Sequence, residues 1–283
     1  MTLALRTVAL TALAMLAFAA NSLLTREGLA GSDTDAATFS LLRILSGAVT
    51  LALILRLRSR PAPAEGEGGW PGALALFAYL IAFSFAYLSL SAGTGALILF
   101  GTVQLTMFTA ALHAGERFPP LGWAGLAIAA GGLFYLMAPG IEAPDPFGAA
   151  LMAVAGIAWG VYSLLGRGAR DPLAATARNF ALATPLVLLV SLANVGSAHL
   201  DPKGAALAVA SGALASGCGY VVWYAALPHL SAGRAATVQL TVPVIAALGG
   251  ALFLSEPLTP RLVLASAITL GGVALVLSRR GKA

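Results

Sequence analysis

Aromatic side chains recur at helical spacing in three apolar segments of the chain. They fall on shared helical faces: Tyr79, Phe83 and Tyr87 in the first segment, Trp159 and Tyr162 in the second, and Tyr220, Trp223 and Tyr224 in the third. A pocket for a small molecule needs apolar or aromatic walls and a few polar groups that orient the ligand. The stripes therefore predict a ligand cavity with walls that include Tyr79, Phe83, Trp159, Tyr162 and Trp223.

The alternative for any of these rings is the belt of Trp and Tyr at a membrane surface. Tyr87 and Tyr224 lie near the ends of their apolar segments, so the belt is the simpler explanation for both. Trp159 lies roughly 13 residues into its segment, about 20 Å at 1.5 Å per residue, which favours the cavity. Tyr79 fits either position, and Trp70 is expected to be a surface anchor.

Three amide side chains lie within apolar segments, namely Gln104, Gln239 and Asn21. An amide in hydrocarbon needs hydrogen-bond partners, so it should face the protein interior or a wet cavity. It can bond a substrate there, or it can hold two helices together. Both readings stay open, and all three amides are candidate cavity residues.

Arg43 is the most costly side chain within the apolar segments, because no Asp or Glu falls in the middle of any of them. Such a cation can extend to the membrane surface, bond free carbonyls at a helix end, or bind a substrate carboxylate. The planar guanidinium suits a carboxylate well. The last reading makes Arg43 a further candidate for the cavity.

Reactive clusters are missing from the sequence. It shows no metal-ligand spacing, no phosphate-binding loop and no nucleophile with a base, so we expect no metal, no cofactor and no enzymatic activity. Proton-coupled carriers commonly use an embedded acid. Since none lies in mid-segment, the pattern favours facilitative transport over simple proton antiport. A scaffold without transport activity is the alternative from another class.

The composition places all these residues in a membrane. Of 283 residues, 59% are hydrophobic and 10% charged, against about 25% charged in a soluble domain. Ten apolar segments predict an all-α polytopic membrane protein, at roughly 5–25, 36–57, 70–91, 94–113, 119–138, 146–167, 173–194, 203–226, 231–253 and 260–278. The net charge of +5 does not indicate a nucleic-acid partner, because basic loops also set membrane orientation.

The basic residues are distributed unevenly between the two sides. With ten spans, twelve Lys or Arg fall on the side of the termini, three on the other side, and Arg43 within a span. Basic residues accumulate in cytoplasmic loops. The bias therefore predicts that both termini are cytoplasmic.

A long repeat divides the chain. Leu90–Gly93 returns as Leu230–Gly233, Glu116 returns as Glu256, and Ser22–Arg26 matches Ser163–Arg167. We expect two five-helix repeats, residues 1–140 and 141–283. Five spans per repeat make the second one inverted, which typically places a substrate site at mid-membrane between the halves. The first segment imitates a signal peptide, but its match to the second half predicts a retained helix.

Three positions in the repeat are candidates for gating or hinge movement. Gly93 and Gly233 occupy equivalent Ser-Ala-Gly sequences, and Pro243 stands where the first half has Val103. If the proline permits bending, movement differs between the two halves.

The doubled pattern resembles the EamA family of the drug/metabolite transporter superfamily. Each half carries Ser-Ala-Gly, a small-residue helix, Glu near Pro, and a Gly-Gly helix: Ser91 to Leu136, and Ser231 to Val276. Within that family the chain is most similar to YddG-type aromatic amino-acid exporters. The resemblance implies ten helices around a central cavity.

The resemblance also implies export of aromatic amino acids or related metabolites by alternating access across a bacterial inner membrane. The partners would be the lipid bilayer and a small-molecule substrate, with a monomer as the expected state. An EamA-type exporter of other amino acids, nucleosides or organic cations, with or without proton coupling, is the alternative.

Overall fold

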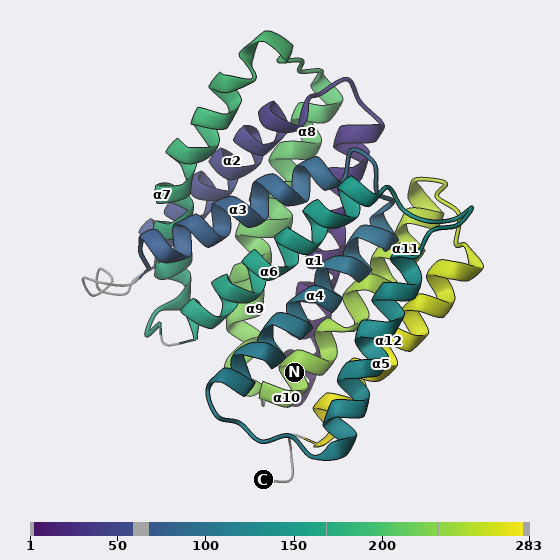
Figure 1. Ribbon diagram of the computed structural model, residues 1–283. Helices are drawn as coiled ribbons and strands as arrows, with labels where there is room; N and C mark the ends of the chain where they lie inside the picture. The colour runs from purple at the N-terminus through teal and green to yellow at the C-terminus, as the bar shows by residue number, and fades with distance from the viewer. Residues whose placement is uncertain (1–2, 59–67, 168, 231, 280–283) are drawn as a thin grey trace.

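The computed structural model describes residues 3–58, 68–167, 169–230 and 232–279, and every element within those ranges is helical (Figure 1). Ser231 lies outside the described residues, as do three of the twelve basic residues counted on the side of the termini, Arg60, Arg280 and Lys282. The helices of the first half are α1 (Leu3–Ala30), α2 (Ala36–Leu57), α3 (Trp70–Ala86), α4 (Ala92–His113) and α5 (Pro120–Met137).

The second half is less regular. It begins with α6 (Pro146–Gly166), α7 (Pro172–Ala193) and the short η1 (Val195–Ser197). The next span passes through α8 (Pro202–Ala210), the π-helical η2 (Ser211–Cys218), α9 (Gly219–Ala226) and η3 (Leu227–His229). The last two spans are α10 (Ala232–Gln239) with α11 (Thr241–Phe253), and α12 (Pro260–Arg279).

The predicted polytopic all-α fold is confirmed. Within the described residues, nine helical segments are long and apolar enough to cross a membrane, and α3 adds a shorter apolar helix of 17 residues. The ten spans alternate in direction. We call the side on which α1 begins and α12 ends the inner face, and the opposite side the outer face (Figure 1).

Aspartates begin several of these helices at positions that the apolar pattern predicts. Asp145, Asp171 and Asp201 each precede a proline at the first helical position, and each accepts a hydrogen bond from a backbone N–H three residues later. An N-cap carboxylate satisfies an otherwise unpaired donor, and proline suits the first turn. Asp35 caps α2 in the same way, through the N–H groups of Ala37 and Thr38.

Most helix packing joins one half of the chain to the other. The pairs α5–α12, α2–α7 and α4–α11 each match a helix with its own counterpart in the repeat. Likewise, α3 packs on α6, while its counterparts η2 and α9 pack on α1. This exchange is the arrangement expected of two repeats around a twofold axis.

Glycines let α5 and α12, the last helix of each half, pack closely together. A Cβ added at Gly125 in α5 would lie 2.7 Å from the Gly272 carbonyl oxygen in α12. No side chain fits there, so the α5–α12 contact depends on glycine.

Several helix boundaries differ from the sequence prediction; α1, for example, continues to Ala30 rather than ending near residue 25. The third segment was expected to reach residue 91, but α3 ends at Ala86, and a turn leads to Ser91, which caps α4 through the Thr94 N–H. Gly93 therefore lies in the first turn of α4 rather than in a loop.

The ninth segment was expected to be continuous, but it is interrupted at Leu240. Pro243 has no N–H to donate to the Gln239 carbonyl four residues earlier, and Gln239 is the residue where α10 ends. The equivalent Val103 lies within the unbroken α4. The proline therefore marks a difference between the two halves.

Candidate functional site

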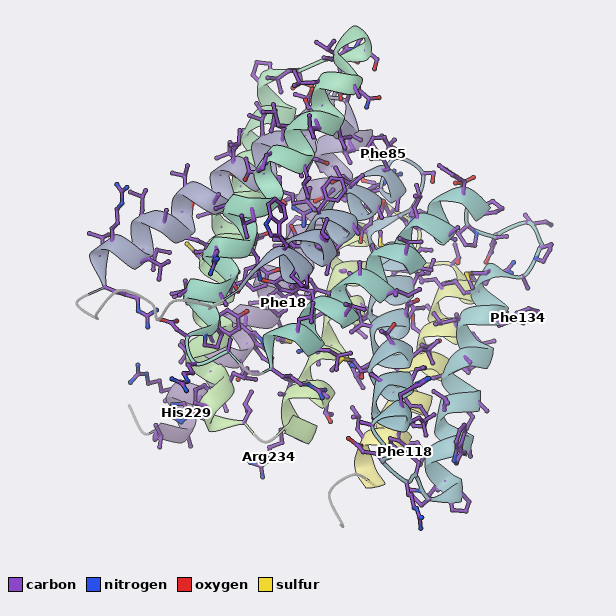
Figure 2. All side chains as sticks on the ribbon, turned by 60° about the vertical axis from the view of Figure 1, so that its left-hand side comes forward. Phe18, Phe85, Phe118, Phe134, His229 and Arg234 are labelled. Atoms are coloured by element: carbon purple, nitrogen blue, oxygen red, sulfur yellow. The ribbon has the colours of Figure 1, made fainter. Side chains whose placement is uncertain are left out.

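A cavity of about 980 Å³ lies among the helices of both halves. Its deep end is lined by Asn21, Tyr79 and Phe83, and its other end by Glu116, Arg167 and Leu230 at the inner face. Figure 2 shows Phe18, another lining residue, amid the helices, and places His229 and Arg234 at the inner face. Since no residue of the outer connections lines it, the cavity opens inward and is closed outward.

Aromatic rings from α3, α6 and α9 contact Trp159. Its ring centroid lies 4.9 Å from that of Tyr79, 5.3 Å from Tyr162 and 5.7 Å from Tyr220. Phe18 packs against Tyr220 from the opposite side at 6.2 Å. Together these rings form an aromatic surface against which a flat apolar group can pack.

A buried polar network closes the deep end of the cavity. Arg43 Nη2 and Asn21 Nδ2 both donate to the Tyr79 hydroxyl oxygen, each at 3.2 Å. The Asn21 Oδ1 atom in turn accepts from Ser211 Oγ at 2.7 Å. The network therefore joins α1, α2 and α3 of the first half to η2 of the second half.

Arg43 is 2% exposed, so it does not extend to the membrane surface. Its guanidinium carbon lies 4.7 Å from the Phe83 ring centroid and 5.6 Å from that of Tyr79. Among the described residues no acidic side chain pairs with it, and its Nε and Nη1 atoms have no hydrogen-bond partner. The free helix carbonyls considered for it do not bind it.

Polar side chains also follow the wall toward the inner face. Tyr162 donates to Thr176 Oγ1 at 3.3 Å, and Tyr224 lies 2.9 Å from the same oxygen. Gln104 of α4 and Gln239 of α10 also line the cavity, one from each half. The cavity wall therefore offers hydrogen-bonding groups at both ends and rings between them.

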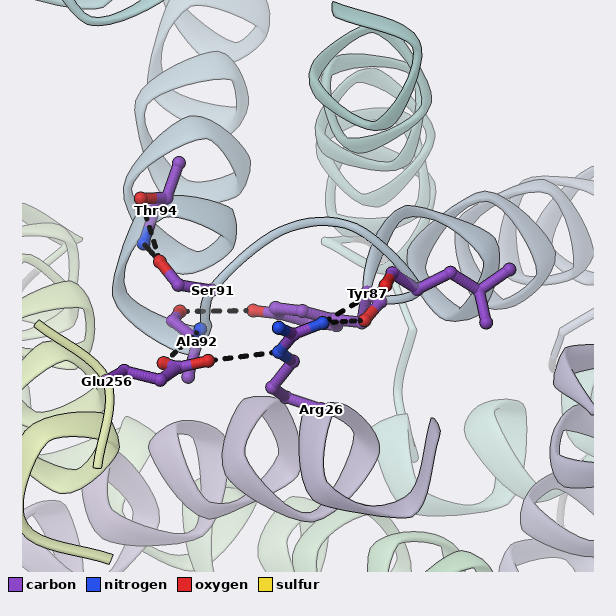
Figure 3. Close-up of polar contacts among 7 residues, drawn as sticks. Arg26, Tyr87, Ser91, Ala92, Thr94 and Glu256 are labelled. Atoms are coloured by element: carbon purple, nitrogen blue, oxygen red, sulfur yellow. Dashed lines mark hydrogen bonds and ion pairs between the residues drawn. The ribbon is translucent and has the colours of Figure 1, made fainter. Parts of the chain in front are cut away.

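The outer face is closed by a cluster around Glu256 (Figure 3). Its carboxylate accepts from Arg26 Nε at 3.0 Å and from the Ala92 N–H at 2.8 Å. Arg26 Nη1 also donates to the carbonyls of Tyr87 and Leu88. We call Arg26, Tyr87, Ala92 and Glu256 the outer seal, since they join α1, the α3–α4 turn and the α11–α12 connection.

A left-handed residue precedes each of the two repeated glutamates. Ser255, just before Glu256, has a φ of 54°, and Gly115, just before Glu116, has a φ of +84°. Such a conformation is costly for serine and free for glycine. The same local turn therefore presents a glutamate at the outer face in one half and at the inner face in the other.

The structure brings together eight of the nine predicted cavity residues. The lining set includes Trp159, Tyr79, Gln104, Gln239, Tyr162, Phe83, Trp223 and Asn21. Arg43 is not part of the lining and contacts it through Tyr79 and Phe83. The gating candidates Pro243 and Gly93 lie in helices outside the lining, and Gly233 lies in the first turn of α10. Gly93 faces Ala247 of α11 so closely that a Cβ would lie 2.7 Å from it.

The belt interpretation of two tyrosines is wrong. Tyr87 is completely buried and its hydroxyl donates to the Ala92 carbonyl, within the outer seal. Tyr224 lines the cavity beside Thr176. Nearness to a helix end indicates depth, but it does not indicate which way the side chain points.

Some lining residues escaped the sequence prediction. Phe18 carried a signal, since it is the counterpart of Trp159 in the repeat. Thr176 and Asn179 of α7, and Ser216 of the π-helical η2, carried none. Within the described residues no three His, Cys, Asp or Glu side chains gather as metal ligands would.

Comparison with known proteins adds the following. Residues 146–278 match the model of the EamA-like transporter family. The chain is 55% identical over 275 residues to an uncharacterized protein of Pseudomonas aeruginosa, covering 97% of this chain and 96% of that protein. It is 26% identical over 195 residues to an uncharacterized transporter of Archaeoglobus fulgidus, with 67% and 69% covered.

A second uncharacterized transporter of Archaeoglobus fulgidus is 29% identical over 198 residues, with 66% of this chain and 68% of that protein covered. A solved crystal structure aligns over 97% of this chain and 98% of its own at a TM-score of 0.68 and 19% identity. At that identity the likeness supports the fold alone.

Proposed function

Since the chain belongs to the EamA-like transporter family and is a multi-pass membrane transporter, we propose that it exports aromatic amino acids or related small metabolites. The observation that carries the proposal is the cavity itself. Trp159 and its neighbouring rings form an apolar wall, and the cavity is open at the inner face and closed at the outer one. An exporter that waits for substrate in the cytoplasm needs this arrangement.

The direction of export depends on which face is cytoplasmic. Twelve of the sixteen Lys and Arg residues belong to the inner face by sequence, and basic residues accumulate in cytoplasmic loops. We therefore assign the inner face to the cytoplasm of a bacterial cell, with both termini there. The cavity is then inward-open.

The proposed mechanism is alternating access by rocking of two inverted repeats, residues 1–140 and 141–283. The packing of each helix on its counterpart, or on the other half, supports this division. Export requires that the outer seal open while the inner face closes. No embedded acid is needed for that exchange, so we propose facilitative transport.

The repeat indicates which residues close the inner face. Arg26 corresponds to Arg167, and Glu256 to Glu116. Arg167 and Glu116 both line the cavity at its open end and both are exposed. By the pseudo-twofold relation, Arg167 should meet Glu116 when the cavity faces outward.

A flux assay tests the function directly. Purified protein in proteoliposomes should move tryptophan, phenylalanine and tyrosine faster than leucine or alanine, with no requirement for a pH gradient. Strict dependence on a proton gradient would rule out the facilitative mechanism. Equal transport rates for aliphatic and aromatic amino acids would rule out a preference for aromatic substrates.

The cavity is also large enough for a second class of substrate, nucleosides or organic cations. About 980 Å³ is near the upper limit of pockets for drug-sized ligands, so a nucleoside or organic cation also fits. Competition of these compounds against labelled tryptophan separates the two classes. A nucleoside that competes better than phenylalanine would favour the second.

A further inference from the structure

We infer that the closed end of the cavity is a carboxylate-binding site in which the Tyr79 hydroxyl donates to the ligand and Arg43 supplies the opposite charge. The inference rests on the proposed function, because it names the chemical group of a substrate in the same cavity. It is carried by the hydrogen bonding of Tyr79 and by the burial of Arg43.

The Tyr79 hydroxyl has its hydrogen left to donate. A phenol has one hydrogen and accepts through its oxygen. The oxygen accepts from Arg43 Nη2 and from Asn21 Nδ2. No acceptor for the hydroxyl hydrogen is found among the described residues, and the Tyr79 ring lines the cavity. A ligand oxygen at the deep end is therefore the available acceptor.

Asn21 is fixed in the orientation that this role requires. Its Oδ1 accepts from Ser211 Oγ, and its Nδ2 donates to the Tyr79 hydroxyl oxygen. Two donors on the phenol oxygen polarise its O–H bond and make it a stronger donor. The sites on the oxygen that could accept are occupied, so an ammonium group has little to gain there.

The charge of Arg43 points to an anion. An unpaired charge buried in a protein is costly, and here no acidic side chain among the described residues offsets it. The N–H groups on Nε and Nη1 of Arg43 have no acceptor among the described residues and can donate to a ligand. A carboxylate beside Tyr79 would offset the charge, and it would be held by charge-assisted hydrogen bonds.

The remaining part of such a ligand would meet the aromatic wall. The Trp159 ring centroid lies 4.9 Å from that of Tyr79, on the open side of the network. A ligand with its carboxylate on Tyr79 therefore has its apolar part among Trp159, Tyr162 and Tyr220. Arylalkyl carboxylates, including aromatic amino acids, have this shape.

The test compares phenyl ligands with and without a carboxylate. Phenylalanine and 3-phenylpropionate carry it, and phenethylamine lacks it. Ligand affinity is measured on the purified full-length protein by thermal stabilisation, for wild type, Tyr79→Phe and Arg43→Gln. Removal of a charge-assisted hydrogen bond should weaken both carboxylates by roughly 10- to 100-fold and leave phenethylamine unchanged.

Tyr224→Phe is the matched control, because it removes a phenol from the inner part of the same cavity. It should alter the affinities for carboxylate and amine equally. Asn21→Ala, which removes one of the two donors to Tyr79, gives a second variant and should weaken carboxylates by a smaller factor. The site is overturned if Tyr79→Phe weakens all three ligands equally or none of them.

The two proposals can fail separately. If aromatic amino acids are not transported but carboxylates still bind in a Tyr79-dependent way, the proposed function fails and the site stands. If they are transported while Tyr79→Phe does not discriminate between carboxylate and amine, the site fails and the function stands.

Discussion

Arg26 and Glu256 are 230 positions apart in the chain and form an ion pair at 3.0 Å, with side chains only 21% and 14% exposed. The pair joins the outer end of α1 to the α11–α12 connection, and the second carboxylate oxygen of Glu256 holds the first residue of α4. One carboxylate thus binds two elements of the first half to one of the second. This makes it the central contact of the outer seal.

Neutralising either partner should open the outer face. Arg26→Gln or Glu256→Gln leaves a partly buried charge without its partner, which costs about 1–3 kcal/mol, or a shift of roughly tenfold or more toward the outward-open state. The measurement is labelling of Ala215→Cys, a cavity position, by an impermeant thiol reagent from outside. The single native cysteine is first changed, as Cys218→Ala.

Lys203→Gln is the control for that experiment. It breaks the Lys203–Glu27 pair at the outer face, which is more exposed and contacts no residue of the outer seal. Labelling should stay at the wild-type rate. If Lys203→Gln increases outside labelling as much as Arg26→Gln does, the outer seal is not specific to Arg26 and Glu256.

Trp159→Ala should impair transport through substrate binding. The substitution removes the ring that contacts Tyr79, Tyr162 and Tyr220, and an aromatic anchor of this kind is worth about 2 kcal/mol or more in binding. We expect KM for tryptophan to rise on the order of tenfold or more. Trp70→Ala, at a 54% exposed ring outside the cavity, should leave KM unchanged.

Pro243→Ala should slow turnover while substrate binding persists. Alanine restores a donor for the Gln239 carbonyl, so α10 and α11 can join into one stiffer helix, as in α4. A several-fold lower maximal flux with an unchanged dissociation constant is expected. Pro185→Ala, which changes an exposed proline within the continuous α7, serves as the control. Equal slowing in both variants would argue against a hinge at Leu240.

Asp35 should stabilise the outer connections only while it is ionised. Burial alone would raise its pKa, but the bonds from Thr38, His199 and Ala37 outweigh it and hold the pKa below the usual 3.8. A lowered folded-state pKa stabilises the protein above the unfolded-state pKa, and this is lost as the pH falls through the folded-state value.

The variant Asp35→Ala should therefore lower the free energy of unfolding by about 1–2 kcal/mol at pH 7, and by less below about pH 3. The melting temperature in detergent at both pH values is the measurement. Asp33→Ala, at an exposed position of the same connection, should have little effect at either pH. An equal loss at pH 7 and pH 3 would show that the charge of Asp35 is not what stabilises the cap.

The length of the apolar segments was sufficient to predict the ten spans and most of their ends. The break at Leu240 and the π-helical η2 could not be predicted, because hydropathy does not distinguish an interrupted apolar helix from a continuous one. Pro243 was the one visible sign. Just past the early end of α3, the Tyr87 ring packs against Phe83 and its hydroxyl donates to the Ala92 carbonyl at the start of α4.

The cavity residues were predictable because aromatic and amide side chains in the middle of an apolar segment usually face the protein interior or a cavity. The residues that they and the charged side chains contact were not predictable. The pairing of Arg26 with Glu256, and of Arg43 with Tyr79, depends on how four helices cross, which helical periodicity along a single segment does not contain. The repeat equates Glu116 with Glu256, but only the structure shows that one lines the open end and the other closes the opposite face.

The burial of Arg43 has a consequence for the energetics of the membrane. Because the cavity is open to the inner face, the voltage drop falls mainly across the closed layer between Arg43 and the outside. When the outer seal opens, the drop moves to the other side of the cation. One charge that crosses the whole field changes its energy by about 2.3 kcal/mol per 100 mV.

An inside-negative membrane potential should therefore favour the inward-open state of the empty transporter and oppose the step that opens the cavity outward. Flux of tryptophan under potassium diffusion potentials should vary with voltage in wild type, and Arg43→Gln should flatten that dependence. If both proteins respond equally, the cation does not move through the field. A single buried arginine would thus let a carrier of neutral substrates sense the electrical state of the cell.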